Sequence, residues 1–88
     1  MVYTIVVHRD AEGRYLVSVP ALKGCHTWGE TLPEALHMAR EAIQGVVEVM
    51  QEHGDPIPPD NPSVTVDMTE AAEAFVYRLT IREAAAVA

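Results

Sequence analysis

The chain has few of the residues that mark secreted, membrane or disulfide-rich proteins. Its 88 residues include one cysteine, one tryptophan and one phenylalanine. A single cysteine excludes an internal disulfide, and an unpaired thiol suits a reducing compartment. No apolar run approaches the roughly 20 residues of a membrane span, and no basic-plus-apolar signal peptide opens the sequence. We therefore expect a cytoplasmic protein with no membrane partner.

Basic residues are scarce as well, and they are unevenly placed. Thirteen acidic against six basic residues give a net charge of −7, and no Lys or Arg lies between Arg40 and Arg78. The carboxylates of that interval are Glu41, Glu48, Glu52, Asp55, Asp60, Asp67, Glu70 and Glu73. Such a field repels phosphate backbones and attracts basic surfaces, although an acidic face can also serve solubility alone. Arg9, Arg14 and Lys23 form no continuous stripe, so we expect no direct nucleic-acid binding.

The first thirty residues predict three strands. Residues 2–9 and 14–19 alternate apolar side chains with others, and the turn-forming residues between them predict an antiparallel hairpin. Pro20 cannot donate to a sheet ladder and so closes the second strand. Gly24 permits the chain to reverse before a third strand at residues 25–30.

A long helix is predicted next. Thr31 is a suitable N-cap, Pro33 is tolerated in the first turn, and Glu34 completes a capping box. The helix should run from residue 32 to about residue 53, with Gly54 as its C-terminal stop. An apolar stripe with the helical period is expected to pack on the sheet. Its members are Leu32, Ala35, Leu36, Ala39, Ile43, Val46, Val47 and Met50.

Further apolar residues widen this stripe on one flank only. They are Met38, Ala42, Gly45 and Val49. A small sheet does not cover so wide an arc, so we interpret this flank as an oligomer contact in a homodimer or tetramer. The alternative is that the C-terminal segment covers it.

The C-terminal part begins with a proline-rich connector. Four prolines between residues 56 and 62 predict a stiff extended segment, followed by alternating strands at 63–68 and 75–81. The expected fold is α+β, with a β-β-β-α-β(-β) sheet packed against one long helix. A chain of this length forms one domain, with a core at about 2–68 and an extension at 69–88.

The residues from Pro20 to Leu36 carry a family resemblance. They read P-x-L-x-G-C-x-T-x-G-E-T-x-x-E-A-L, after a hairpin and before a helix that ends near a Gly-Asp-Pro. This pattern, over about residues 3–67, resembles the HicB-like antitoxin domain. The resemblance implies a partial ribonuclease-H-like fold and a protein that occludes a small basic HicA-type ribonuclease toxin. Two-part members of the family add a C-terminal DNA-binding module, and the residues after Asp67 are too few for one.

No catalytic, cofactor or metal site is predicted. A working ribonuclease H site needs carboxylates that converge on two metal ions, the first from the opening strand, and residues 2–9 contain none. Asp10 and Glu12 are ordinary turn formers. His37 and Glu41, one helical turn apart, lack a third ligand and are better interpreted as a solvated pair.

A nucleophilic site is not indicated either. Cys25 and His26 are adjacent, but successive strand side chains point to opposite faces of a sheet. His8 could approach either of them across the sheet. With no third orienting group signalled, we interpret Cys25 as a small buried thiol beside a surface histidine.

The side chain of Trp28 has two possible positions. On the sheet face away from the helix it would be an exposed anchor of the kind that dominates interfaces, whereas on the helix face it would be part of the core.

The leading hypothesis is a non-enzymatic antitoxin that binds and blocks a HicA-type mRNA-cleaving toxin. The expected toxin-contacting residues are Trp28, Glu41, Glu48, Glu52 and Asp55. The alternatives are a stand-alone regulatory or ligand-binding homo-oligomer of the same fold, and a degenerate hydrolase that uses Cys25 or the histidines.

Overall fold

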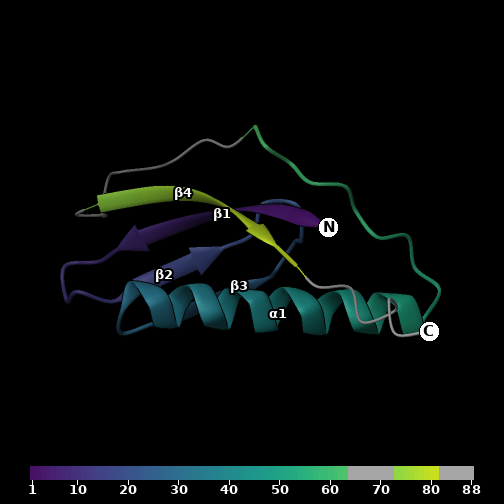
Figure 1. Cartoon of the computed structure of the whole chain (residues 1–88), viewed down its shortest axis with the longest axis horizontal. Coiled ribbons are helices and arrows are strands. Elements are labelled where there is room, and N and C mark those ends of the chain that lie inside the picture. The colour runs from purple at the N-terminus through teal and green to yellow at the C-terminus, as the bar shows by residue number, and fades with distance from the viewer. Residues whose placement is uncertain (64–72, 82–88) are drawn as a thin grey trace.

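The protein is built from two layers, a sheet and one long helix that lies along it (Figure 1). The computed structural model describes residues 1–63 and 73–81. In chain order, the elements are β1 (Val2–Arg9), β2 (Tyr15–Ser18), β3 (His26–Gly29), α1 (Leu32–Glu52) and β4 (Glu73–Thr80). These elements confirm the α+β fold expected from the sequence.

The sheet is antiparallel throughout, with strand order β3-β2-β1-β4. The hairpin of β1 and β2, the third strand and the strand expected at 75–81 are all confirmed, the last as β4 beside β1. The strand expected at 63–68 and the end of the extension lie outside the described residues, apart from Ser63, which is not in a strand.

One face of the sheet packs against α1 and the other looks away from it. The register aligns Val7 with Val17 and with Phe75, and the buried members of this row belong to the hydrophobic core. Because side chains alternate along a strand, the neighbouring row of Leu16 and Trp28 points to the opposite face, which we call the outer face. The alternation of side chains along the strands therefore determines which of them α1 covers.

The buried side of α1 is narrower than its sequence predicts. Ala35, Ala39, Ile43 and Val47 are buried, and they repeat every four residues along one line. Leu36, Val46 and Met50, which the sequence predicts on the buried stripe, are only half-buried, although Leu36 and Val46 do pack against the core as expected. Helix α1 lies along the β3 side of the sheet (Figure 1).

Local hydrogen bonds fix both ends of α1. The Thr31 hydroxyl accepts from the Glu34 N–H at 3.2 Å, as an N-cap should. The Glu34 carboxylate accepts from the N–H of Glu30 at 3.4 Å, so the capping box closes one residue earlier than its usual form. At the other end Gly54 adopts a φ of 71°, the left-handed conformation that ends many helices.

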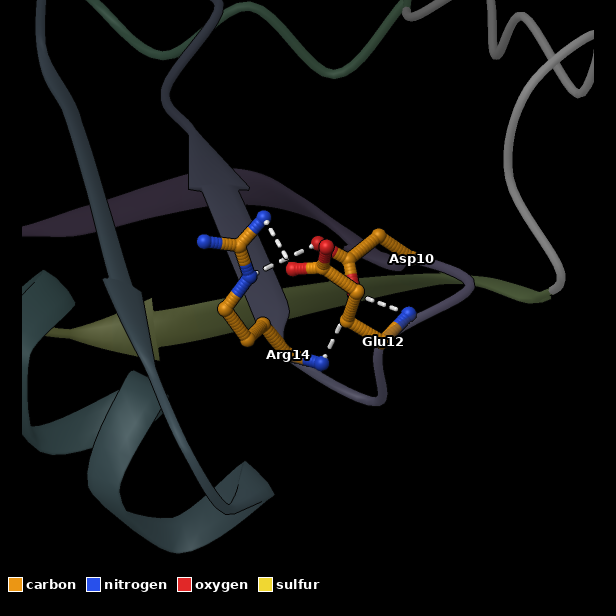
Figure 2. A network of polar contacts seen from close by, with 3 residues as sticks. All are labelled: Asp10, Glu12 and Arg14. Carbon is orange, nitrogen blue, oxygen red and sulfur yellow. Dashed lines mark hydrogen bonds and ion pairs between the residues drawn. The ribbon is translucent and has the colours of Figure 1, made fainter.

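The β1–β2 hairpin is closed by a small polar network (Figure 2). One oxygen of Asp10 accepts from the backbone N–H groups of Glu12 and Arg14, while the other lies 2.9 Å from the Arg14 Nε. Arg14 also reaches the Glu12 carboxylate at 2.9 Å. The bonds that Asp10 accepts, led by the one from the Arg14 backbone, lower its pKa. Asp10 therefore has a structural role in this turn.

Strand β3 and the first turn of α1 approach each other closely at Gly29. A Cβ placed on Gly29 would lie 2.5 Å from the Ala35 nitrogen and 2.8 Å from its Cα. Both are backbone atoms, which cannot move aside without moving the helix. Glycine at this position therefore allows α1 to sit against β3.

The proline-rich connector is tied to β1 by hydrogen bonds. Asp60 accepts from the Thr4 backbone N–H at 2.7 Å and from its hydroxyl at 2.8 Å, and Thr4 is buried. The Tyr3 hydroxyl donates to the Pro58 carbonyl. Burial alone would raise the pKa of Asp60, but the two bonds from Thr4 and further polar contacts outweigh it, so the pKa is lowered.

We predict that Gly29→Ala destabilises the fold by roughly 1–3 kcal/mol, because the methyl group overpacks against backbone. The matched control is Gly45→Ala in α1, where an added Cβ meets nothing within 4 Å. Alanine is the better helix former, so this control should stabilise by about 0.5–1 kcal/mol. Urea unfolding of both variants provides the measurement, and equal effects would contradict the close contact.

We predict that Asp60→Asn flattens the dependence of stability on acid pH. Because folding lowers the pKa of Asp60 from its ordinary 3.8, the ionised carboxylate stabilises the fold above that value. This contribution is lost as the pH falls through the folded pKa. Asp60→Asn should thus be less stable than the natural chain at pH 7, with a smaller difference in acid.

The control for Asp60 is Asp55→Asn, which removes an exposed carboxylate from the start of the same connector. Its unfolding free energy should follow the natural chain between pH 7 and the acid range. If the curves for Asp60→Asn and the natural chain run parallel, the Thr4 contact does not stabilise the fold through ionised Asp60.

Candidate partner-binding surfaces

Two separate surfaces of the molecule expose large apolar side chains. Met38 and Val49 are exposed on α1, where they belong to the flank defined above. The remaining exposed large hydrophobic residues of the described chain are Val2, Leu16, Trp28 and Val76. All four of these lie on the outer face of the sheet, as the strand registers show.

The flank of α1 forms a shallow apolar hollow along the helix. Ala42, Gly45 and Val49 line it together with half-buried Val46 and Met50, and Glu41 lies at its border. Val49 is 51% exposed and Met38 is 38% exposed, so neither α1 nor the sheet covers this side. Whether the flank contacts another copy of the chain, as its sequence suggests, stays a prediction.

An acidic row runs directly beside this flank. Glu41, Glu48 and Glu52 are separated by seven and four residues, so they share one side of α1, and all are exposed. Glu34, one heptad before Glu41, extends the row toward the helix start. The sequence analysis assigned Glu34 only to the helix cap and did not include it in this acidic row. Its spacing of seven residues from Glu41 would have placed it there.

The fold separates Trp28 from the acidic residues with which the sequence grouped it. Trp28 is 50% exposed and points to the outer face of the sheet. It borders a hollow of about 430 Å³ together with Leu16, His8 and His26. The acidic row lies on α1, on the side turned away from the sheet, so the two sets belong to opposite faces of the molecule.

The same alternation separates Cys25 from His26. Cys25 is buried in the core, and burial raises the pKa of its thiol. His26 is exposed and borders the hollow on the outer face. A protonated thiol with its neighbouring imidazole on the other side of the sheet is not arranged as a nucleophile and base.

The described residues support neither a metal site nor a membrane-spanning helix. His37 Nε2 lies 3.3 Å from a Glu41 oxygen, and both side chains are exposed, as a solvated helix pair would be. No group of three or more potential metal ligands occurs within residues 1–63 and 73–81. In the same residues, no helix has the length and apolar character that a membrane crossing requires.

Comparison with known proteins identifies the family. Residues 3–83 match the family described as the HicB-like antitoxin of the bacterial toxin–antitoxin system. The chain belongs to the HicB-like antitoxin family. The resemblance drawn from Pro20 to Leu36 is thereby confirmed.

Sequence relatives of this HicB-like chain include proteins from archaea and cyanobacteria. A UPF0150 protein of Thermoplasma acidophilum, Ta0767, is 46% identical over 61 residues, which are 69% of this chain and 88% of the relative. A UPF0150 protein of Synechocystis, ssr1765, is 34% identical over 59 residues, or 67% of this chain and 75% of the relative.

Solved structures support the same assignment. The N-terminal domain of the Burkholderia pseudomallei antitoxin HicB aligns with a TM-score of 0.67 and 33% identity, covering 93% of this chain and 99% of that one. A chain from a HicA3 and HicB3 toxin–antitoxin complex aligns with a TM-score of 0.65 over 93% and 99% of the two chains. At 23% identity, this second match shows the fold alone.

Proposed function

We propose that this chain is a non-catalytic antitoxin that binds and blocks a small, basic, HicA-type mRNA-cleaving toxin. Membership of the HicB-like family and the likeness to the Burkholderia pseudomallei antitoxin support this function. A partner that cleaves mRNA acts where mRNA is translated, so the proposal places the chain in the cytoplasm. The chain itself acts by occupying the toxin and needs no cofactor.

One observation carries the proposal, namely that the acidic row of α1 borders the apolar flank. Glu41 and Glu48 are each three or four residues from Gly45, so carboxylates and apolar side chains are neighbours on the helix surface. Asp55 continues the negative charge just beyond the helix end. Glu41, Glu48, Glu52 and Asp55 remain the proposed charged contacts from the sequence.

The proposed mechanism is competition for a cationic surface. An RNA-cleaving protein must present positive charge to the phosphates of its substrate, and the acidic row presents negative charge in their place. Opposite charges accelerate the encounter of the two proteins, and this effect fades as salt screens it. Desolvated apolar contacts at the flank then hold the complex and set its dissociation rate.

The apolar part of the toxin contact is assigned here to the flank rather than to Trp28. A partner seated on the acidic row of α1 reaches Met38 and Val49 on the same helix, whereas Trp28 faces the other side of the sheet. The flank would therefore contact the toxin, and not a second copy of the chain as its sequence suggested. Charge favours the toxin as the partner, since two copies that met through their flanks would bring two acidic rows together.

We predict that Glu48→Lys/Glu52→Lys slows association with the cognate toxin and flattens its salt dependence. Dissociation should change little, because exposed charges act mainly on the encounter. Stopped-flow or surface-based kinetics over a series of salt concentrations provide the measurement. A purified toxin encoded beside this chain is the binding partner for the assay.

The control for this pair is Glu12→Lys/Glu73→Lys, at the hairpin end of the sheet. Each reversal adds two positive charges, so both double variants change the net charge from −7 to −3. The ion pairs lost in the control, with Arg14 and Arg9, are exposed and contribute little to stability. If both double variants slow association equally, net charge alone steers the encounter and the acidic row is not the docking site.

We predict that Val49→Ser accelerates dissociation of the toxin complex by roughly five- to tenfold, about 1–1.4 kcal/mol, while association stays within about twofold. Val76→Ser is a matched control, because Val76 is 50% exposed against 51% for Val49 but lies on the outer face. This control should leave the association and dissociation rates of the toxin unchanged.

Absence of any affinity for a basic protein encoded nearby would contradict the proposed function and favour a stand-alone oligomer.

A further inference from the structure

Helix α1 has a polar side that the proposed toxin contact does not use. His37, Arg40 and Gln44 are separated by three and four residues, so they share one side of the helix. Successive helical residues are about 100° apart, which places Arg40 on the other side of α1 from Met38 and Ala42 of the flank. A partner seated on the flank therefore leaves the side of Arg40 open.

These three residues line a hollow of about 590 Å³ between α1 and the end of β4. Thr80 and Ile81 form its other wall, and Figure 1 shows the end of β4 approaching α1. Ile81 is buried in the hydrophobic core, so core packing holds this wall in place. Pockets for small molecules measure about 300–1,000 Å³, and this hollow is of that size. We call it the Arg40 hollow.

The guanidinium of Arg40 has no partner among the described residues. Arg40 is the single lysine or arginine of α1, and it makes no ion pair or hydrogen bond within residues 1–63 and 73–81. By contrast, Arg14 lies 2.9 Å from the Asp10 carboxylate. The carboxylate next to Arg40 in the chain, that of Glu41, contacts His37 at 3.3 Å instead. A positive charge is thus left available at the hollow.

The lining of the hollow fits an anionic group. A guanidinium presents five N–H donors in a planar fork, and the amide of Gln44, which makes no hydrogen bond to a described residue, adds two more. None of the five lining residues is Asp or Glu. A ligand that takes Arg40 out of water must compensate its charge, and only an anion does so.

Carboxylates near the hollow restrict the size of that anion. Glu41 follows Arg40 directly, and Glu48 lies one helical turn after Gln44. Their repulsion acts on every phosphate of a nucleic acid that passes along the helix, whereas a small ligand meets it with one group only. The net charge of −7 acts in the same direction. The hollow therefore suits a small molecule with a single anionic group.

We propose that the Arg40 hollow binds the phosphate group of a small phosphorylated molecule. Arg40 and Gln44 are one helical turn apart, so their donors approach a shared ligand from two positions. A tetrahedral phosphate has oxygens for both, whereas one guanidinium fork satisfies a planar carboxylate. The rest of the molecule occupies the remaining volume, against Thr80 and Ile81.

The first test titrates the natural chain with inorganic phosphate at constant ionic strength and follows the side-chain N–H signals by NMR. The expected result is a saturable change in the signals of Arg40 and Gln44, with those of Arg14 unchanged. Acetate should bind roughly tenfold more weakly, because it leaves one set of donors without an acceptor. Changes that do not saturate at tens of millimolar phosphate overturn the proposal, and so does equal affinity for acetate.

The second test compares two variants that each remove one positive charge. Arg40→Gln should weaken phosphate binding by roughly tenfold, the effect of losing a charged hydrogen bond. The matched control is Arg78→Gln, because Arg78 is exposed on the same strand as Thr80 but does not line the hollow. Both variants change the net charge from −7 to −8. If both weaken binding equally, phosphate senses net charge alone and the proposal fails.

The inference stands or falls separately from the toxin contact. Gln44→Ala changes no charge, so it should weaken phosphate binding severalfold and leave the association and dissociation rates of the toxin unchanged. If Gln44→Ala slows toxin association while its fold is intact, the hollow belongs to the toxin contact and the small-molecule assignment is overturned. If no toxin binds but phosphate still saturates the Arg40 signal, the proposed function fails and this inference holds.

A single-stranded oligonucleotide tests the remaining class of anion. It should bind no more tightly than inorganic phosphate, because the carboxylates beside the hollow repel its other phosphates. If it binds more tightly, and Arg40→Gln removes that affinity while Arg78→Gln does not, the ligand is a nucleic acid and the proposal is overturned.

Discussion

The contact between α1 and β3 at Gly29 determines which residues of α1 are buried against the sheet and which are exposed to a partner. Because no side chain separates Gly29 from the backbone of Ala35, the helix sits directly against the edge strand. Its line of small and branched residues, from Ala35 to Val47, faces the sheet and fills the core. The acidic and apolar residues on the remaining sides of α1 are thereby left in solvent.

A domain of this size has little interior to spare for a binding cavity, so its interactions depend on its surfaces. The two layers provide two of them, one on α1 and one on the outer face of the sheet. Carboxylates border the first, and they are the physical basis for assigning a cationic partner to it.

The acidic residues of the chain do not act as one group. Asp10 and Asp60 accept several hydrogen bonds each, and the pKa of each is lowered because those bonds favour the ionised carboxylate. They close the hairpin and hold the connector on β1. The carboxylates along α1 are exposed and remain available to a partner. Net charge alone does not separate these two groups of carboxylates, since only the fold shows which of them already accept hydrogen bonds within the chain.

The sequence by itself determined the elements, the family and the presence of an acidic interval. Alternation, the Thr31 cap and the glycines predict these features because they depend on neighbours along the chain. Only the tertiary structure decided that Trp28 is exposed, that it lies opposite the acidic row, and that the buried line of α1 excludes Leu36 and Met50. Those outcomes depend on strand order and on where the helix crosses the sheet, which distant residues set through packing and which no local pattern contains.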